Sequence, residues 1–262
     1  MTPNKNLNAY YAKSMVAIVS IVLMSFAINQ KKQTKVYLIG DSTMANKEVK
    51  AFPETGWGMP FAYFFDSTVE IDNRAKNGRS TKTFITENLW KPIVENLNEG
   101  DYVFIQFGHN DEVKEKIGSY TTPEQYKTNL VKFVTETRGK KALPILLTPV
   151  TRRRFDSAGR MQETHPVYSE LVKEVAEAFK VPFIDMDTKS RELLQQFGPE
   201  NSKWLFMQLE PGEHPNYPEG RNDNTHFNEF GARKMAQLVL KELRGLNLSL
   251  TDHIRPPLAP KK

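Results

Sequence analysis

Residues 102–107, Tyr-Val-Phe-Ile-Gln-Phe, form an almost uninterrupted apolar run that ends at Gly108. Such a run is typical of a strand that is buried on both faces, as the strands of a parallel sheet are. Working outward, four more short segments have the composition of strands. They are residues 35–39, 69–73, 143–148 and 181–184.

Segments with the periodicity of amphipathic helices lie between these strands. Thr122 and Pro123 are typical of an N-cap and a first helical residue, Gln125 completes a capping box, and Gly139 ends the segment. Two later helices present one apolar face each: Leu171, Val172, Val175 and Phe179 in the first, and Ala232, Met235, Ala236, Val239 and Leu243, before Gly245, in the second. The alternation of strands and helices predicts one doubly wound α/β/α sandwich, in three layers.

Binding sites in such sheets lie beyond the carboxyl ends of the strands. The first strand runs into Gly40-Asp41-Ser42-Thr43. A serine at this place can expose its hydroxyl near the start of a following helix, with its N–H facing incoming negative charge. Alternatively, Asp41 and Ser42 cap that helix.

Two further strand ends carry candidate oxyanion donors. Gly78, after the second strand, can let a ligand approach the backbone N–H, or it can belong to an ordinary Asn-Gly turn. After the third strand, Asn110 offers a neutral amide donor, which suits a developing oxyanion. The alternative there is turn chemistry, with His109 as a packed or surface residue.

Asp223 and His226 precede the last predicted helix and are three residues apart. Such a pair can meet around a turn, so that the carboxylate accepts from one imidazole nitrogen and leaves the other to take a serine proton. The alternatives are a metal pair, completed by His214, and a capping Asp beside a structural His. Taken together, Ser42, His226, Asp223 and the two oxyanion donors supply every group that acyl transfer requires.

These motifs resemble the SGNH (GDSL-like) hydrolase superfamily. Gly40-Asp41-Ser42, Gly78, Gly108-His109-Asn110-Asp111 and Asp223-x-x-His226 match its four blocks, between about residues 35 and 245. The resemblance implies a flavodoxin-like sheet of five parallel strands. It also implies Ser42 as the nucleophile, His226 as the base and Asp223 as its orienter. The oxyanion hole would then consist of the Ser42 and Gly78 N–H groups and the Asn110 amide.

Longer stretches are similar to the rhamnogalacturonan acetylesterases of carbohydrate esterase family 12. They are residues 40–45, 77–84, 107–111, 148–155, 215–220 and 223–232. This similarity implies a secreted serine esterase that acts on acetylated pectin and needs neither a cofactor nor a metal. Other functions remain open: an esterase for acetylated xylan or another ester, a metal-dependent hydrolase, or a carbohydrate-binding module.

Four residues are candidates for binding the substrate. Arg79, Arg152 and Arg153 can each grip a galacturonate carboxylate with a bidentate pair of hydrogen bonds. Ion pairs within the chain, or a solvated basic loop, are the alternative. Tyr217 belongs to a Pro-rich loop, residues 210–220, that can shape the acetyl pocket or cover a sugar face.

The composition excludes several classes of site. The chain of 262 residues has no cysteine, so disulfides, Cys-ligated metals and a thiol nucleophile are ruled out. It has 36 basic and 31 acidic residues, and the first 27 residues hold Lys5, Lys13 and no acid. Without that segment 34 basic residues face 31 acidic ones, a net charge of +3 that does not indicate a nucleic-acid partner.

The N-terminus has the pattern of a secretory signal peptide. A polar segment with two lysines precedes an apolar run over residues 15–28, and small residues at Ser25 and Ala27 suit cleavage after Ala27. The run is shorter than the roughly 20 residues that span a bilayer, although a retained anchor is the alternative. We therefore expect a signal peptide (1–27), a short lead (28–34), a hydrolase domain (35–250) and a tail (251–262). The mature protein would be secreted or periplasmic and free of the membrane; its oligomeric state is left open.

Overall fold

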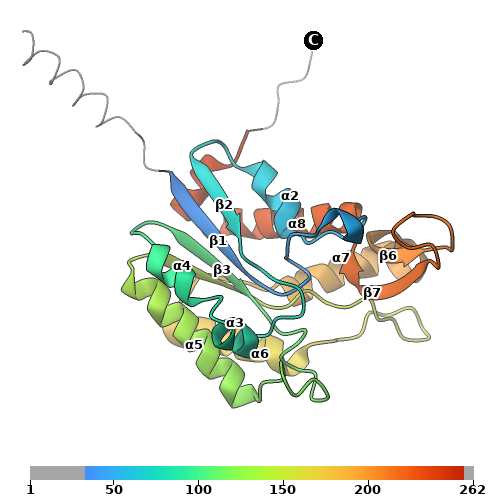
Figure 1. Cartoon of the computed structure of the whole chain (residues 1–262), viewed down its shortest axis with the longest axis horizontal. Helices are drawn as coiled ribbons and strands as arrows, with labels where there is room; N and C mark the ends of the chain where they lie inside the picture. Colours follow the sequence, from blue (N-terminus) through green and yellow to red (C-terminus); the bar gives the residue numbers. More distant parts are fainter. Residues whose placement is uncertain (1–32, 257–262) are drawn as a thin grey trace, which may run out of the picture. The chain divides into compact units, whose positions relative to one another are not determined.

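The structure is a computed structural model that describes residues 33–256. Five parallel strands form one sheet in the order β2-β1-β3-β4-β5 (Figure 1). The strands are β1 (Thr34–Gly40), β2 (Val69–Asn73), β3 (Tyr102–Gln106), β4 (Leu143–Leu147) and β5 (Phe183–Ile184). The α/β class and the five-stranded parallel sheet expected from the sequence are thereby confirmed.

Helices cover both faces of this sheet and make it the middle of three layers (Figure 1). One face packs against α3 (Thr81–Thr86), α4 (Lys91–Asn96), α5 (Pro123–Gly139) and α6 (Pro166–Phe179). The other packs against α2 (Gly58–Phe61), α7 (Met186–Asn201) and α8 (Glu229–Gly245). Four short 3-10 helices complete the helical elements among the described residues: η1 (Val49–Ala51), η2 (Ala62–Phe64), η3 (Ser202–Leu205) and η4 (Ser249–His253).

The sheet separates two apolar cores, which explains the continuous apolar runs. In β1, Val36 and Leu38 belong to the core beneath α8, whereas Tyr37 and Ile39 belong to the core beneath α5. Strand residues alternate between faces, so a strand buried on both sides needs apolar residues at every position. The polar exception in β3 is Gln106, whose side chain accepts from the indole of Trp57 at 2.8 Å and donates to the Thr148 carbonyl at 3.0 Å.

Two elements differ from the prediction. β5 is shorter than residues 181–184, because the Val181 N–H still bonds to the Ala176 carbonyl of α6 at 2.8 Å. An antiparallel pair that the sequence did not predict, β6 (Phe206–Leu209) and β7 (Arg221–Phe227), precedes α8, and β7 contains Asp223 and His226. The expected signal peptide lies outside the described residues. Within residues 33–256, no helix combines the length and the apolar character needed to cross a membrane.

The order of the strands determines where a site can form. β2 lies on one side of β1, and β3, β4 and β5 follow on the other, so the connections leave in opposite directions from β1 and β3. Ligands in open α/β sheets bind at this switch point, beyond the carboxyl ends of the two strands. Ser42 follows β1 and Asn110 follows β3, so both lie beside it.

Candidate active site

A tight turn after β1 presents Ser42. Asp41 is fully buried and accepts hydrogen bonds from the N–H and the hydroxyl of Thr43, at 2.9 and 2.8 Å. Gly40 is required before this turn, because a Cβ there would lie 2.6 Å from the Gln106 carbonyl oxygen. The helix expected directly after Ser42 does not form: the Trp57 N–H bonds to the Thr43 carbonyl at 2.9 Å and holds the segment as a turn.

Three side chains expected to act together lie in hydrogen-bond contact. The Ser42 hydroxyl is 2.9 Å from His226 Nε2, and His226 Nδ1 is 2.8 Å from Asp223 Oδ2. This is the order of contacts by which a carboxylate orients an imidazole that in turn activates a serine. The sequence predicted this arrangement, although Ser42 is 184 positions away from His226 in the chain.

Asp223 is held as a carboxylate. Its Oδ1 accepts the N–H groups of Thr225 and His226, at 2.8 and 3.0 Å, and its Oδ2 accepts from Arg221 at 2.9 Å. Partial burial favours the neutral acid, but the hydrogen bond and charge of His226, together with Arg221, outweigh it. The pKa of Asp223 therefore lies well below its usual range.

A bulge in β7 brings Asp223 to His226. Phe206 of β6 pairs with Phe227, but the next residue, Met207, pairs with Asp223. Residues 224–226 are therefore left over on the β7 side and have no ladder partner in β6, although the Gln208 side chain of β6 donates to the Asn224 amide oxygen at 3.0 Å. A bulge bends the strand and re-aims its side chains, and here it turns the His226 ring back toward the Asp223 carboxylate.

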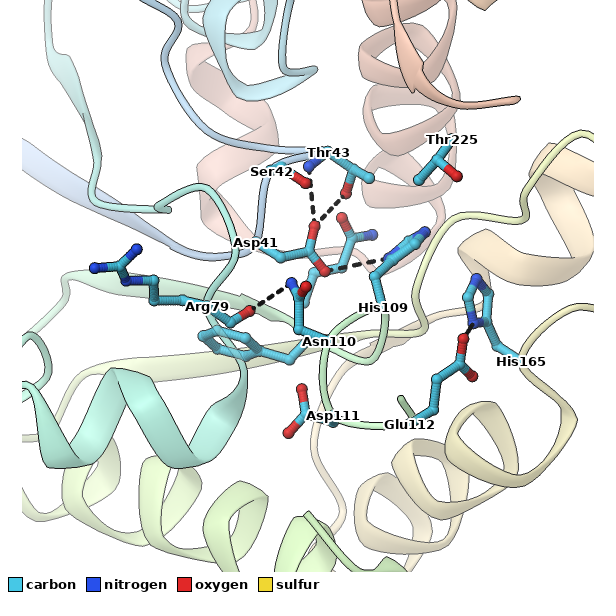
Figure 2. Close-up of polar contacts among 12 residues, drawn as sticks. Asp41, Ser42, Thr43, Arg79, His109, Asn110, Asp111, Glu112, His165 and Thr225 are labelled. Carbon is cyan, nitrogen blue, oxygen red and sulfur yellow. Dashed lines mark hydrogen bonds and ion pairs between the residues drawn. The ribbon is translucent and has the colours of Figure 1, made fainter. Parts of the chain in front are cut away.

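The candidate oxyanion donors occupy two loops that are bonded to each other. Gly78 has φ of +75°, in a turn closed by the Arg79 N–H and the Lys76 carbonyl at 3.2 Å. The Asn110 amide donates to the Arg79 carbonyl at 3.0 Å, as Figure 2 shows, which leaves its second N–H for a ligand. The Lys76 N–H in turn bonds to the Gly40 carbonyl at 3.0 Å, so this turn is tied to the end of β1.

The other two polar residues of the Gly-His-Asn-Asp block, His109 and Asp111, are buried beneath these loops. His109 faces Asp41 with 3.2 Å between Nδ1 and Oδ2 (Figure 2), and its ring packs 4.4 Å from that of His165. Burial lowers the pKa of His109 to about 4, although Asp41 opposes this shift. The ring is therefore neutral near pH 7 and donates its Nδ1–H. His109 is thus a packed histidine, one of the two alternatives left open by the sequence.

Asp111 accepts hydrogen bonds at the first residue of α3. Its Oδ1 accepts from the Thr81 N–H and hydroxyl, at 2.9 and 2.5 Å, and from the Thr121 hydroxyl at 2.9 Å. Burial nevertheless raises the pKa of Asp111 to about 7. Sequence reasoning did not assign this residue a role, because its partners come from two distant segments.

The four candidate substrate-binding residues all bond within the chain. Arg79 pairs with Glu87 at 2.8 Å. Arg152 donates to the Thr225 hydroxyl at 2.6 Å, and Arg153 donates to the Asn224 side chain at 2.9 Å. The Tyr217 hydroxyl donates to the Ala51 carbonyl at 2.8 Å, which ties the 210–220 loop to η1. Their binding of a substrate stays a prediction.

No metal group accompanies the Asp–His pair in the described part of the chain. Within residues 33–256, no three His, Asp or Glu side chains are grouped so that they could hold an ion. His214, proposed as the third ligand, instead accepts the Asn216 N–H at 3.1 Å.

A hollow of about 1,020 Å³ lies beside the β6–β7 pair. Its wall includes Asn222 and Asn224 of β7 and the exposed ring of Trp204, but neither Ser42 nor His226. The hollow therefore adjoins the strand that carries Asp223 and His226.

Comparison with known proteins agrees with this geometry. The chain is 42% identical to the rhamnogalacturonan acetylesterase RhgT of Bacillus subtilis over 86% of its own length and 95% of the relative's. It is 35% identical to the probable rhamnogalacturonan acetylesterase YesY of the same organism, over 84% and 96%. The crystal structure of YxiM from Bacillus subtilis superposes with a TM-score of 0.72 at 25% identity, over 83% of this chain and 58% of that one.

The family itself is shown by a match to the model of the GDSL-like Lipase/Acylhydrolase family, which spans residues 38–234. That span contains every block motif noted above, from Gly40 to His226. The chain therefore belongs to the GDSL-like lipase/acylhydrolase family and is a carboxylic ester hydrolase.

Proposed function

We propose that this protein is a secreted or periplasmic esterase that removes acetyl groups from acetylated rhamnogalacturonan, with Ser42 as its nucleophile. The observation that carries the mechanism is the chain of contacts from Ser42 through His226 to Asp223, at 2.9 and 2.8 Å. The substrate is supported by the 42% identity to RhgT, which extends over almost the whole length of both proteins.

In the first half of the reaction, the Ser42 hydroxyl attacks the acetyl carbonyl carbon while His226 Nε2 takes its proton. The imidazolium that forms is stabilised by the Asp223 carboxylate. The oxygen of the tetrahedral intermediate becomes negative and accepts hydrogen bonds from the Ser42 and Gly78 N–H groups and the Asn110 amide. His226 then protonates the sugar oxygen, which leaves as a hydroxyl.

In the second half, water replaces the sugar. His226 takes a proton from this water, and the resulting hydroxide attacks the acetyl group on Ser42. The intermediate collapses, acetate leaves, and the proton returns from His226 to the Ser42 oxygen. The product acid gives its proton to the solvent, so the neutral sugar hydroxyl, the acetate and this proton account for all atoms of the ester and of one water molecule.

The decisive experiment measures acetate released from acetylated rhamnogalacturonan, acetylated xylan and p-nitrophenyl acetate, by wild type and by Ser42→Ala. We expect release from the pectic polymer by wild type, with release from all three substrates abolished in the variant. A preference for xylan would contradict the substrate and leave the mechanism intact. Activity that survives in a folded Ser42→Ala would contradict the mechanism.

The location of the protein is tested separately. Secretion rests on the pattern of residues 1–27, with Ser25 and Ala27 before the expected cleavage site. N-terminal sequencing of protein recovered from the host's periplasm or medium should begin at Ile28. Recovery of full-length protein with the membrane fraction would show a retained anchor instead.

A further inference from the structure

Three consecutive arginines follow β4 and differ in their exposure. Arg152 and Arg153 are partly buried, whereas Arg154 is exposed. Arg152 uses both terminal nitrogens within the chain: Nη1 donates to the Thr225 hydroxyl at 2.6 Å and Nη2 donates to the His109 carbonyl at 3.2 Å. The two acceptors belong to different segments of the site.

Each acceptor adjoins a candidate catalytic group. Thr225 directly precedes His226, and its own N–H bonds to Asp223 Oδ1 at 2.8 Å. The His109 carbonyl belongs to the peptide group that continues into Asn110. A single guanidinium thus joins the segment that carries the base to the segment that carries the oxyanion donor. Because a guanidinium is planar and its N–H groups have fixed directions, it sets the spacing of the two segments.

The segment around Thr225 is held in place by hydrogen bonds from side chains, not by the β6–β7 ladder. Residues 224–226 form the bulge of β7 and have no ladder partner in β6. Arg153 holds the first of them, since its backbone N–H donates to the Asn224 carbonyl at 2.8 Å and its side chain to the Asn224 amide oxygen at 2.9 Å. Arg152 holds the second, Thr225. The third is His226 itself.

The guanidinium of Arg152 also has an acidic neighbour, Glu112. Glu112 Oε1 lies 3.7 Å from Arg152 Nη2 and 2.9 Å from His165 Nδ1. Figure 2 shows the Glu112 and His165 pair on the side of His109 away from Asp41. His165 is fully buried in the interior of the domain.

We propose that Arg152 is a positioning residue, which fixes His226 relative to the oxyanion donor Asn110 and does not bind a carboxylate of the substrate. The proposal rests on the serine mechanism proposed above. It predicts a defect in turnover on any acetyl ester, including one without a carboxylate. A substrate-binding arginine would instead affect only the affinity for an acidic polymer.

The test compares Arg152→Ala, Arg152→Lys and Arg154→Ala on p-nitrophenyl acetate and on acetylated rhamnogalacturonan. Arg152→Ala should lower kcat about tenfold to a hundredfold on both substrates, with KM for the small ester changed little, because small misplacements of reacting groups have costs of this size. Arg152→Lys keeps the positive charge but lacks the two terminal nitrogens of the guanidinium, so its kcat should be little higher than that of Arg152→Ala. Arg154→Ala, the matched control, should keep the wild-type kcat on the small ester.

Two further measurements separate positioning from a loss of folding. Added guanidinium ion should partly restore the kcat of Arg152→Ala, since it can occupy the space between Thr225 and His109. Thr225→Val removes one acceptor and leaves Arg152 in place. Its effect on kcat should not add to that of Arg152→Ala, because both changes break the same contact.

The overturning outcomes are distinct. A wild-type kcat for Arg152→Ala on p-nitrophenyl acetate, with a raised KM on the polymer alone, would make Arg152 a substrate-binding residue. A lower kcat with neither guanidinium rescue nor coupling to Thr225 would make its role structural. If Ser42→Ala stays active, the mechanism itself fails; if wild type prefers xylan, only the proposed substrate fails and the Arg152 result stands.

Discussion

Asn110 is expected to act through one N–H of its amide. The other N–H is bound to the Arg79 carbonyl at 3.0 Å, which fixes the plane of the amide. Asn110→Ala should lower kcat for acetate release about a hundredfold to a thousandfold, the usual cost of one oxyanion donor. Steady-state kinetics on p-nitrophenyl acetate check this, with circular dichroism to show that the variant is folded. An unchanged kcat would remove Asn110 from the oxyanion hole.

Lys47 is a buried cation beside the other oxyanion loop. Its ammonium bonds to Glu54 and to the Asn77 side chain, both at 2.7 Å, and its side chain has no exposed surface. Burial lowers the pKa of Lys47, although Glu54 opposes the shift. Removing one partner of such a pair leaves the other desolvated, so Lys47→Met should lower the free energy of unfolding by about 3–5 kcal/mol. Because Asn77 precedes Gly78, kcat should fall as well.

Denaturant unfolding and the kcat for p-nitrophenyl acetate measure the two effects of Lys47→Met. The control is Lys50→Met, which breaks a pair with Glu48 in which both side chains are largely exposed. Exposed pairs contribute little, so this variant should match wild type in both measurements. If Lys47→Met equals its control, the buried pair does not support the Gly78 turn.

At the scale of elements, the position of α8 against η3 is fixed by a glycine. A Cβ at Gly231 would lie 1.8 Å from the Leu205 carbonyl oxygen, a backbone atom that can move only with its segment. Gly231→Ala should therefore destabilise the fold by about 1–3 kcal/mol or more. It should also reduce kcat, since α8 begins two residues after Phe227, which follows the candidate base.

Thermal unfolding of Gly231→Ala and Gly245→Ala isolates the effect of this contact. Gly245 ends the same helix and has open space where a Cβ would be. Alanine there should raise stability by up to about 1 kcal/mol, because it favours the helical backbone. Equal effects of the two substitutions would show that the close approach to Leu205 does not restrain α8.

The elements that the sequence predicted are those with a strong periodic signal. β3 and α5 were found because their burial produces a long apolar run or an apolar stripe that is visible in one dimension. β7, Arg-Asn-Asp-Asn-Thr-His-Phe, has no such signal, since only Phe227 is fully buried in it. Its pairing with β6 and its bulge result from tertiary contacts, so the sequence indicated that Asp223 and His226 meet but not how.

The same limit applies to the site residues. Ser42, Gly78 and Asn110 could be located because the sheet places strand ends together, whatever the loops do in detail. The contacts of Arg152 could not, because its acceptors are a carbonyl 43 positions away and a hydroxyl 73 positions away. A basic cluster has the same appearance in a sequence whether it faces a substrate or a neighbouring loop.

At the scale of the whole molecule, the buried imidazole beneath the site makes stability depend on pH. His109 has a pKa of about 4 in the folded protein, and an unfolded chain has the ordinary value near 6.5. The groups that face this ring are Asp41, His165 and Arg152. Between these two pKa values the unfolded state binds the additional proton, so the His109 contribution to the free energy of unfolding should decrease as the pH falls from about 6.5 to about 4. Asp111, with its pKa raised to about 7, contributes in the opposite direction over this range, so the His109 contribution has to be isolated with a variant.

The pKa of Asp41 is held below its usual range, since His109 and Thr43 outweigh the effect of burial. The contribution of Asp41 to the free energy of unfolding is complete above about pH 4, the ordinary pKa of an aspartate, and is lost as the pH falls further. The two groups therefore act in adjacent windows. In urea unfolding, the stability of wild type relative to His109→Gln should fall by about 3 kcal/mol between pH 7 and pH 4, because this difference isolates His109 from Asp111. His109→Gln should be less stable than wild type at pH 7 and should lose less as the pH falls to 4. Equal slopes for the two proteins would mean that the His109 ring takes up its proton in the folded state at its ordinary pKa, and that its burial against Asp41 does not exclude the charge.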